Sequence, residues 1–251
     1  WRQVEDGVGR VRAILKANGP SRSRWDAFGK GRSNAPGGGP LLSVGADLVL
    51  VERTLMAGEL CCPDCGQRLS PWGHAAPRFV RAAAGRVRRI RPRRAICSDA
   101  VGCGRSHVLL PRFCLGRRVD VMGVIWAALL ARAAGQGWRV ITAAAGRPAS
   151  TVRGWLSRFA AHAEAIRVAF AWLERRVAAG GDLDRLEPTG GVVGDAVAQI
   201  GAACAAVRRR WGAAVLAVSP AQMVAACSGG WLLAARALRH AGLWINTSPH
   251  L

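Results

Sequence analysis

The chain has 251 residues, enough for one large domain or two small ones, and its 36 Lys and Arg against 15 Asp and Glu give a formal net charge of +21. Residues 1–159 hold 27 of the basic and 9 of the acidic side chains, so the front part suits a polyanion such as nucleic acid, while residues 160–251 are close to neutral. The longest apolar run, Val121 to Ala131, is too short to span a bilayer, and the absence of tyrosine excludes a tyrosine recombinase.

Residues 1–40 have the composition of a poorly ordered segment and linker. The linker is clearest at Asn34 to Pro40, which is built of Gly, Pro and small residues, and Val4 to Ala17 is compatible with a helix. The first ordered domain is expected at 41–112. It opens with the apolar stretch Leu41 to Val51 and a short helix at Glu52 to Gly58.

Two cysteine pairs follow, with the spacing of a zinc ribbon. Cys62-Pro-Asp-Cys65 is a C-x2-C knuckle, and 31 residues separate it from the second pair, Cys97 and Cys103, which has five residues between its cysteines. Four thiolates at two tight turns predict a closed, tetrahedral structural Zn²⁺ site. Eight cysteines without a secretory signal also predict a reducing cytoplasm.

Other ligand sets remain open for this site. Cys61 adjoins Cys62 and is able to replace it, although only Cys62 preserves the C-x2-C spacing. His74 and His107 are possible substitute ligands, with packing or polar contact as their more ordinary roles. Two buried thiol pairs without metal are the remaining alternative.

An arginine-rich hairpin is expected between the cysteine pairs. Two strands, Pro77 to Arg81 and Arg86 to Arg91, flank a turn at Ala83 to Gly85. A short hairpin has little core, so its guanidinium groups should point outward and bind phosphate oxygens, unless they form only a solvated surface. The arginines expected to contact DNA here are Arg78, Arg81, Arg86, Arg88, Arg89, Arg91, Arg93 and Arg94.

Residues 117–160 are predicted to form a helix-turn-helix. A helix at Arg118 to Ala134 precedes a second at Trp138 to Ala145, and Gly146 makes the turn to a third that a serine cap opens before Val152. An ordinary helical hairpin is the alternative. The residues expected to contact DNA are Arg147, Ser150, Thr151, Arg153, Ser157 and Arg158, with Ser150 better placed as the cap and Arg153 directed at base edges.

Residues 161–251 are predicted to form a C-terminal helical bundle. An amphipathic helix continues from Phe159 to Gly180, and a stripe with helical spacing runs from Val193 to Trp211. Ser219 and Pro220 cap a further helix ending at Gly229, and Leu232 to His240 is a last candidate. The stripe either packs on the preceding helices or forms a homodimer interface. The fold class is therefore mainly α with a small β zinc ribbon.

Five segments carry a resemblance to known DNA-binding proteins: Cys62-Pro-Asp-Cys65-Gly, Pro71-Trp-Gly-His74, Arg91-Pro-Arg-Arg-Ala-Ile-Cys97, His107-Val-Leu-Leu-Pro111 and Gly146-Arg-Pro-Ala-Ser-Thr-Val-Arg-Gly-Trp-Leu156. Over roughly residues 45–160 the chain resembles a bacterial family of zinc-ribbon and helix-turn-helix proteins of unknown function. It is similar in layout to the N-terminal DNA-binding region of insertion-sequence transposases. The resemblance implies DNA binding linked to a mobile element; Gly154, on the exposed face of the reading helix, departs from it.

The expected function is sequence-specific binding of double-stranded DNA without catalysis, at the nucleoid in the cytoplasm. The carboxylates after the helix-turn-helix lie on one loop or on Ala-rich helices, so no sheet is expected to gather a two-metal centre from Glu164, Glu174, Asp182, Asp184, Glu187 and Asp195. Two other roles remain open. One is a transcription regulator of a chromosomal operon, and the other is an adaptor whose C-terminal helices recruit a separate transposase.

Overall fold

The computed structural model describes residues 41–97, 102–178, 183, 186–212 and 218–234. Helices predominate, with one small mixed sheet and one two-stranded sheet, so the expected class of a mainly α chain with a small β part is confirmed. The predictions for residues 1–40 lie outside the described residues. Leu232 and Leu233 lie in a turn, and the rest of the helix predicted there also lies outside, from residue 235 onward.

The mixed sheet holds the part of the chain that carries the cysteine pairs. Its strands are β1 (Leu41–Val44), β2 (Ser70–His74), β5 (Arg93–Ile96) and β6 (Ser106–Pro111), in the order β1-β6-β5-β2. β1 runs parallel to β6, an addition that the sequence did not predict, and the other pairs are antiparallel. Between β1 and β2 lies α2 (Leu48–Met56), which begins at Asp47 because that carboxylate accepts hydrogen bonds from two amides of the first turn.

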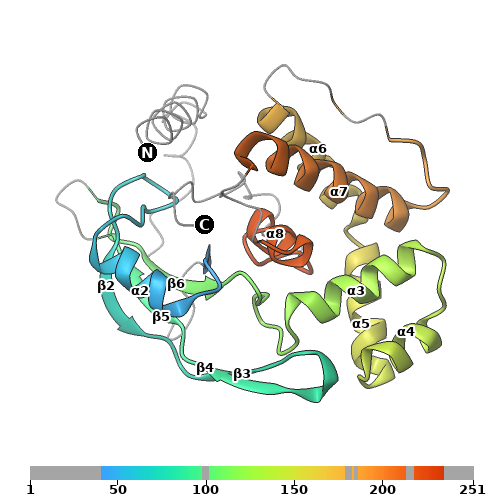
Figure 1. Cartoon of the computed structure of the whole chain (residues 1–251), viewed down its shortest axis with the longest axis horizontal. Helices are drawn as coiled ribbons and strands as arrows, with labels where there is room; N and C mark the ends of the chain where they lie inside the picture. Colours follow the sequence, from blue (N-terminus) through green and yellow to red (C-terminus); the bar gives the residue numbers. More distant parts are fainter. Residues whose placement is uncertain (1–40, 98–101, 179–182, 184–185, 213–217, 235–251) are drawn as a thin grey trace.

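The arginine-rich segment forms the predicted hairpin. β3 (Arg78–Arg81) pairs antiparallel with β4 (Val87–Ile90) around a turn at Ala83–Gly85. Two residues of its inner face, Val80 and Ile90, are buried in a cluster with Leu110 and Cys114. The hairpin runs from the sheet toward helices α4 and α5 (Figure 1).

Six helices form the rest of the described chain. They are α3 (Met122–Ala133), α4 (Trp138–Ala145), α5 (Ala149–Ala160), α6 (Ala163–Ala178), α7 (Val192–Trp211) and α8 (Pro220–Cys227). One hydrophobic cluster extends through all of them, from Leu115 to Leu233, so residues 117–160 and the C-terminal helices share a core. Figure 1 shows α6 and α7 side by side above α3, α4 and α5.

Several predicted helix boundaries are corrected, and the short helix expected at Glu52 to Gly58 is α2, at Leu48–Met56. The first helix begins at Met122 rather than Arg118, because the backbone of Val119 and Val121 is hydrogen-bonded to Arg81 of the hairpin. α5 begins at Ala149, with Pro148 at the N-cap position and no side-chain cap, so Ser150 lies within the first turn and the serine-cap prediction is wrong. The helix expected from Phe159 onward is interrupted between Ala160 and Ala163.

The Val193 to Trp211 stripe packs within the chain. Its central members Val197, Ile200, Cys204 and Val207 are buried in the same cluster as the apolar face of α6. The packing interpretation is therefore confirmed, and the stripe is not free to form the homodimer interface that was its alternative.

The turn between α4 and α5 requires a glycine. Gly146 has φ +58°, a left-handed conformation that costs other residues about 1–2 kcal/mol. We expect Gly146→Ala to lower the free energy of unfolding by about that amount in chemical denaturation. The control is Gly201→Ala in the middle of α7, where a Cβ meets nothing within 4 Å and helix propensity predicts a gain. If Gly146→Ala and Gly201→Ala changed the free energy of unfolding equally, the requirement for glycine at position 146 would be contradicted.

Candidate metal centre and nucleic-acid interface

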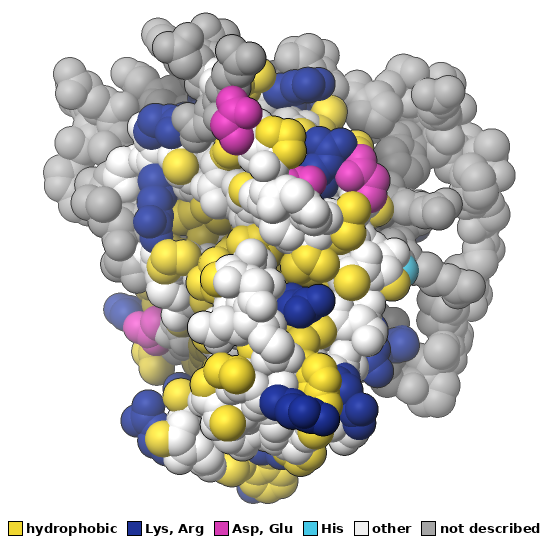
Figure 2. All heavy atoms as spheres, turned by 90° about the vertical axis from the view of Figure 1, so that its right-hand side faces the viewer, with side chains coloured by type: hydrophobic (Ala, Val, Ile, Leu, Met, Phe, Trp, Pro, Cys, Tyr) yellow, Lys and Arg dark blue, Asp and Glu magenta, His cyan; other side chains and the backbone are white. Residues whose placement is uncertain are grey.

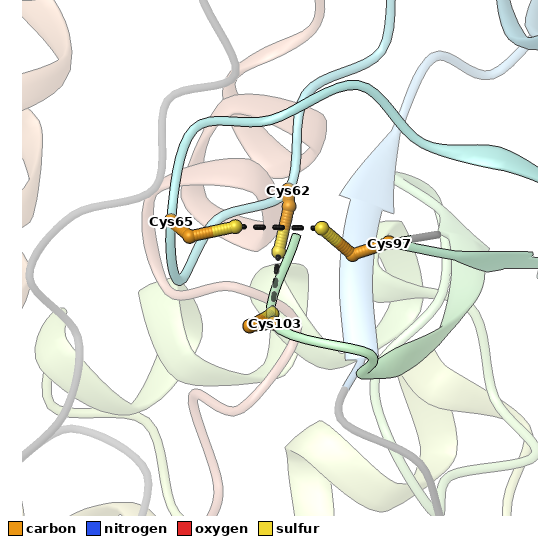
Figure 3. Close-up of side chains that lie close together, drawn as sticks. All are labelled: Cys62, Cys65, Cys97 and Cys103. Carbon is orange, nitrogen blue, oxygen red and sulfur yellow. Dashed lines mark hydrogen bonds between the residues drawn. The ribbon is translucent and has the colours of Figure 1, made fainter. Parts of the chain in front are cut away.

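The four predicted cysteines converge at one point of the sheet region. Cys62 and Cys65 lie on the turn after α2, Cys97 follows β5, and Cys103 precedes β6. All four Sγ atoms lie within 4.8 Å of one another, and Figure 3 shows them facing a common centre. This arrangement is able to hold a metal ion.

The sulfur spacing fits a tetrahedral site. The Sγ atoms of Cys62 and Cys103 lie 3.6 Å apart, and those of Cys65 and Cys97 lie 3.4 Å apart. Four sulfurs placed about 2.3 Å from a central Zn²⁺ would be separated by about 3.8 Å. The observed distances are close to this value, so a single ion fits with little movement of the thiols.

The two cysteine pairs have the same backbone geometry despite their different spacing. The amide of Gly66 donates to the Cys62 carbonyl at 2.8 Å, and the amide of Gly104 donates to the Cys97 carbonyl at 3.0 Å. The first cysteine of each pair donates in turn to the residue two places after the second cysteine, at 2.6 Å to Gln67 and 2.9 Å to Arg105. Cys97 and Cys103, with five residues between them, therefore form the same hydrogen-bonded turn as Cys62 and Cys65. Gly66 and Gly104, which follow the two pairs, both have positive φ.

The surroundings shift the pKa values of the cysteine thiols in different directions. Burial raises the pKa of Cys62, with Cys103 adding to the rise, and burial likewise raises the pKa of Cys97 to about 11. Burial also acts to raise the pKa of Cys65, but hydrogen bonds with the Gln67 backbone and with Cys97 lower that pKa overall. A cation between the sulfurs would stabilise all four thiolates, which is the charge balance that a closed thiolate site needs.

Of the substitute ligands, only His107 borders the cluster. His107 is fully buried on β6, and its Nε2 lies 3.4 Å from the Cys62 Sγ and 4.0 Å from an Asp64 carboxylate oxygen. Burial lowers its pKa, which favours a neutral ring able to donate one hydrogen bond to the sulfur. Cys61 is not among the grouped ligands, and His74 is exposed beside Arg93, so neither replaces a member of the set.

The hairpin arginines divide into two groups. Arg86, Arg88, Arg89 and Arg91 are exposed, and Arg88 lies over the Phe113 ring at 5.9 Å. The other four are half-buried and already have partners: Arg78 with the Arg118 carbonyl, Arg81 with Asp120, Arg93 with Glu52, and Arg94 with Ser106. The prediction that all eight guanidinium groups point outward is wrong for these four, because α2, β6 and the segment before α3 supply acceptors.

Arg147 is also corrected, since it is 7% exposed and bound within the chain. Its Nε donates to Asp120 at 2.5 Å, and its terminal nitrogens donate to the carbonyls of Gly146 at 3.1 Å and Ala82 at 2.6 Å. Asp120 is buried and also pairs with Arg81 at 3.1 Å. Arg147 therefore joins the α4–α5 turn to the hairpin and does not face a ligand.

The remaining predicted side chains lie together on α5. Ser150, Arg153, Ser157 and Arg158 are exposed and Thr151 is half-buried, while Val152, Trp155 and Phe159 enter the core. Arg158 donates to the Gly154 carbonyl at 2.8 Å, and a Cβ at Gly154 would meet that guanidinium, so the glycine leaves room for it. In Figure 2, several basic side chains lie among hydrophobic and other atoms on the lower part of the face, where α4 and α5 lie.

Trp138 and Arg139 were not predicted as site residues. The guanidinium of Arg153 lies 5.1 Å from the Trp138 ring centre, and that of Arg139 lies 5.3 Å from it. This stacking orients Arg153. The sequence places Trp138 and Arg139 next to each other at the start of α4. Only the fold shows that the Trp138 ring reaches Arg153 of α5.

Comparison with known proteins adds no assignment: no protein-family model, no curated protein and no solved structure matches the chain. Among the helices that the structure describes, none has the length and apolar character needed to cross a membrane.

Proposed function

We propose that this protein binds double-stranded DNA in a sequence-dependent way, with α4 and α5 as a helix-turn-helix. The supporting observation is the two-sided character of α5, whose buried face packs on α3 and α4 while Ser150, Arg153, Ser157 and Arg158 face outward. A helix that presents polar and basic residues near its N-terminus suits base edges in the major groove. Arg153, oriented by Trp138, is the side chain we assign to base contact.

The cysteine cluster has a structural role in this proposal. It binds one Zn²⁺ through Cys62, Cys65, Cys97 and Cys103, as in a zinc ribbon, and keeps the sheet that carries the hairpin folded. Arg86 and Arg91, which are exposed at either end of β4, then contact phosphates beside the groove that α5 enters.

The biological role follows from the resemblance noted above. We propose end recognition or regulation of transposition at a mobile element, without a catalytic step in this chain. An adaptor role is favoured by one observation: α6 exposes Val168 and Trp172, which offers a separate transposase an apolar contact away from α5. Genomic neighbours distinguish this role from that of a transcription regulator of a chromosomal operon.

The proposal predicts different losses at two arginines. In-vitro selection from random duplexes should yield a preferred site, at which Arg153→Ala costs about 1–3 kcal/mol at one base position and relaxes preference there. Arg86→Ala should weaken binding to selected and random duplexes alike. It should also reduce the slope of log affinity against log salt by about one, the contribution of one phosphate contact. Titrations at several salt concentrations measure both.

The two variants serve as each other's controls. The contrary outcome is that Arg153→Ala weakens binding to selected and random DNA equally while Arg86→Ala changes the selected sequence. In that case the hairpin reads the bases and α5 contacts the phosphates, the reverse of the proposal. If the unmodified protein selects no sequence, α4–α5 is an ordinary helical hairpin.

A further inference from the structure

The outer face of the β3–β4 hairpin carries apolar side chains that no role has yet explained. In the strand register, Phe79 is opposite Arg89, and Arg81 is opposite Val87. Directly opposed residues share one face of a hairpin, so Phe79, Arg81, Val87 and Arg89 lie on the same face. Arg81 is half-buried and paired with Asp120, and we call the three exposed residues, Phe79, Val87 and Arg89, the outer hairpin face. Arg78, Val80, Arg88 and Ile90 lie on the other, inner face.

The outer hairpin face is exposed while the inner face enters the core. Phe79 is 60% exposed and Val87 58%, whereas Val80 and Ile90 are each 2% exposed. Phosphate binding needs the arginines of this hairpin but gains nothing from an exposed phenylalanine and valine. The apolar pair indicates a partner that also offers apolar groups.

The charge around this face favours a nucleic acid as that partner. The hairpin segment 78–91 contains six arginines and no acidic residue, and the nearby Asp120 is buried with Arg81 and Arg147. An apolar pair within such a basic segment complements the major groove of DNA, which presents thymine methyl groups between two phosphate backbones.

The position of the hairpin suits the same duplex. Hydrogen bonds from Arg147 to the Ala82 carbonyl and between Arg81 and the Val119–Val121 backbone hold the hairpin beside the α4–α5 turn (Figure 1). DNA that contacts α5 therefore passes close to the hairpin. A major groove about 12 Å wide accepts a two-stranded ribbon.

We propose that the outer hairpin face enters the major groove of the DNA bound by α5, where Phe79 and Val87 contact thymine methyl groups. The hairpin is then a second base-reading element, and Arg89 faces base edges rather than phosphate. This inference rests on the proposed function, because it requires that α5 already places a duplex beside the hairpin.

The test asks whether the Phe79 side chain contacts the methyl group of thymine. The probe is a duplex obtained by selection from a random library, prepared once with thymine and once with uracil, which lacks the methyl group. The full-length protein should bind the uracil duplex about fourfold more weakly for each methyl group that the hairpin contacts. Phe79→Ala should bind the thymine duplex more weakly and show a smaller difference between the two duplexes, as measured by fluorescence anisotropy.

Val49→Ala is the matched control, since Val49 is 66% exposed on α2, an element outside the hairpin and the α4–α5 pair. It should keep the full thymine preference, and circular dichroism should show all three proteins equally folded. The inference is overturned if the unmodified protein shows no preference for the thymine duplex, or if Phe79→Ala shows the same preference. Either result leaves the proposed binding of DNA by α5 standing.

Two further results would also overturn the inference. One is a selected site without A·T pairs in the part that the hairpin protects. The other is a change from oligomer to monomer in Phe79→Ala by light scattering, since the face would then be a protein interface. No binding of any duplex by the unmodified protein would instead show that the proposed function has failed.

Discussion

Loss of the proposed Zn²⁺ is expected to unfold the sheet that carries the hairpin. Cys62 and Cys97 belong to the small core formed with Leu55, Leu69 and Leu109, so the cluster is part of the packing as well as a binding site. Structural zinc contributes on the order of 10–16 kcal/mol in small zinc-binding domains, as much as the whole stability of a typical domain. Elemental analysis should show about one zinc per chain. Cys97→Ser or a strong chelator should abolish the cooperative melting of this region.

Cys61→Ser is the matched control for this prediction. Cys61 is adjacent to Cys62 but lies outside the cluster, so its replacement should leave both metal content and melting unchanged. A protein purified without metal, or a Cys61→Ser variant that loses as much metal as Cys97→Ser, would refute the assigned ligand set. Retention of metal by both Cys62→Ser and Cys97→Ser would refute it as well.

The second large effect is expected at Arg147. Its replacement by alanine leaves the buried carboxylate of Asp120 with Arg81 as its one ion-pair partner among the described residues, and it removes the donor to the Ala82 carbonyl. Breaking a buried ion pair by removing one partner typically costs about 3–5 kcal/mol. For a chain of this size we expect the melting temperature to fall by roughly 10 °C, measured by calorimetry. Duplex binding should weaken too, because the hairpin is no longer held beside the α4–α5 turn.

Arg153→Ala separates this effect from a simple loss of charge. Arg153 is exposed on α5, so its removal should leave the melting temperature within about 2 °C of the unmodified protein, as surface substitutions usually do. An Arg147→Ala variant that melts normally but binds DNA less well would show that Arg147 contacts DNA directly. That result would restore the role first expected from the sequence.

The connection through Asp120 also gives the two proposed DNA-binding elements a fixed relative position. The hairpin is bonded at Arg81 and Ala82 to the segment before α3 and to the α4–α5 turn. In the proposed complex with DNA, residues of the hairpin and of α5 would therefore meet one duplex in one register. A binding site should accordingly have a constant spacing between the bases that each element reads.

Local pattern was sufficient for much of the fold. The cysteine spacing predicted the ligand set that converges in the structure, and the two strand-like segments around the turn at Ala83 to Gly85 predicted the hairpin. The helix from Trp138 to Ala145 was predicted with its observed bounds, and Ser219 does cap α8. These features depend on residues close together in the chain, or on ligand chemistry that fixes which side chains must meet.

The roles of the arginines depended on tertiary structure. Arg147 and Arg153 lie six residues apart around the same turn, yet one is buried against Asp120 and the other is exposed over Trp138. In the same way, the Val193 to Trp211 stripe determined that α7 must bury an apolar face, and only the position of α6 decided that the face is buried within the chain. Periodicity shows which side of an element is apolar, but the partner of a charge or an apolar face comes from distant segments. Burial of a guanidinium is favourable only where the fold supplies an acceptor.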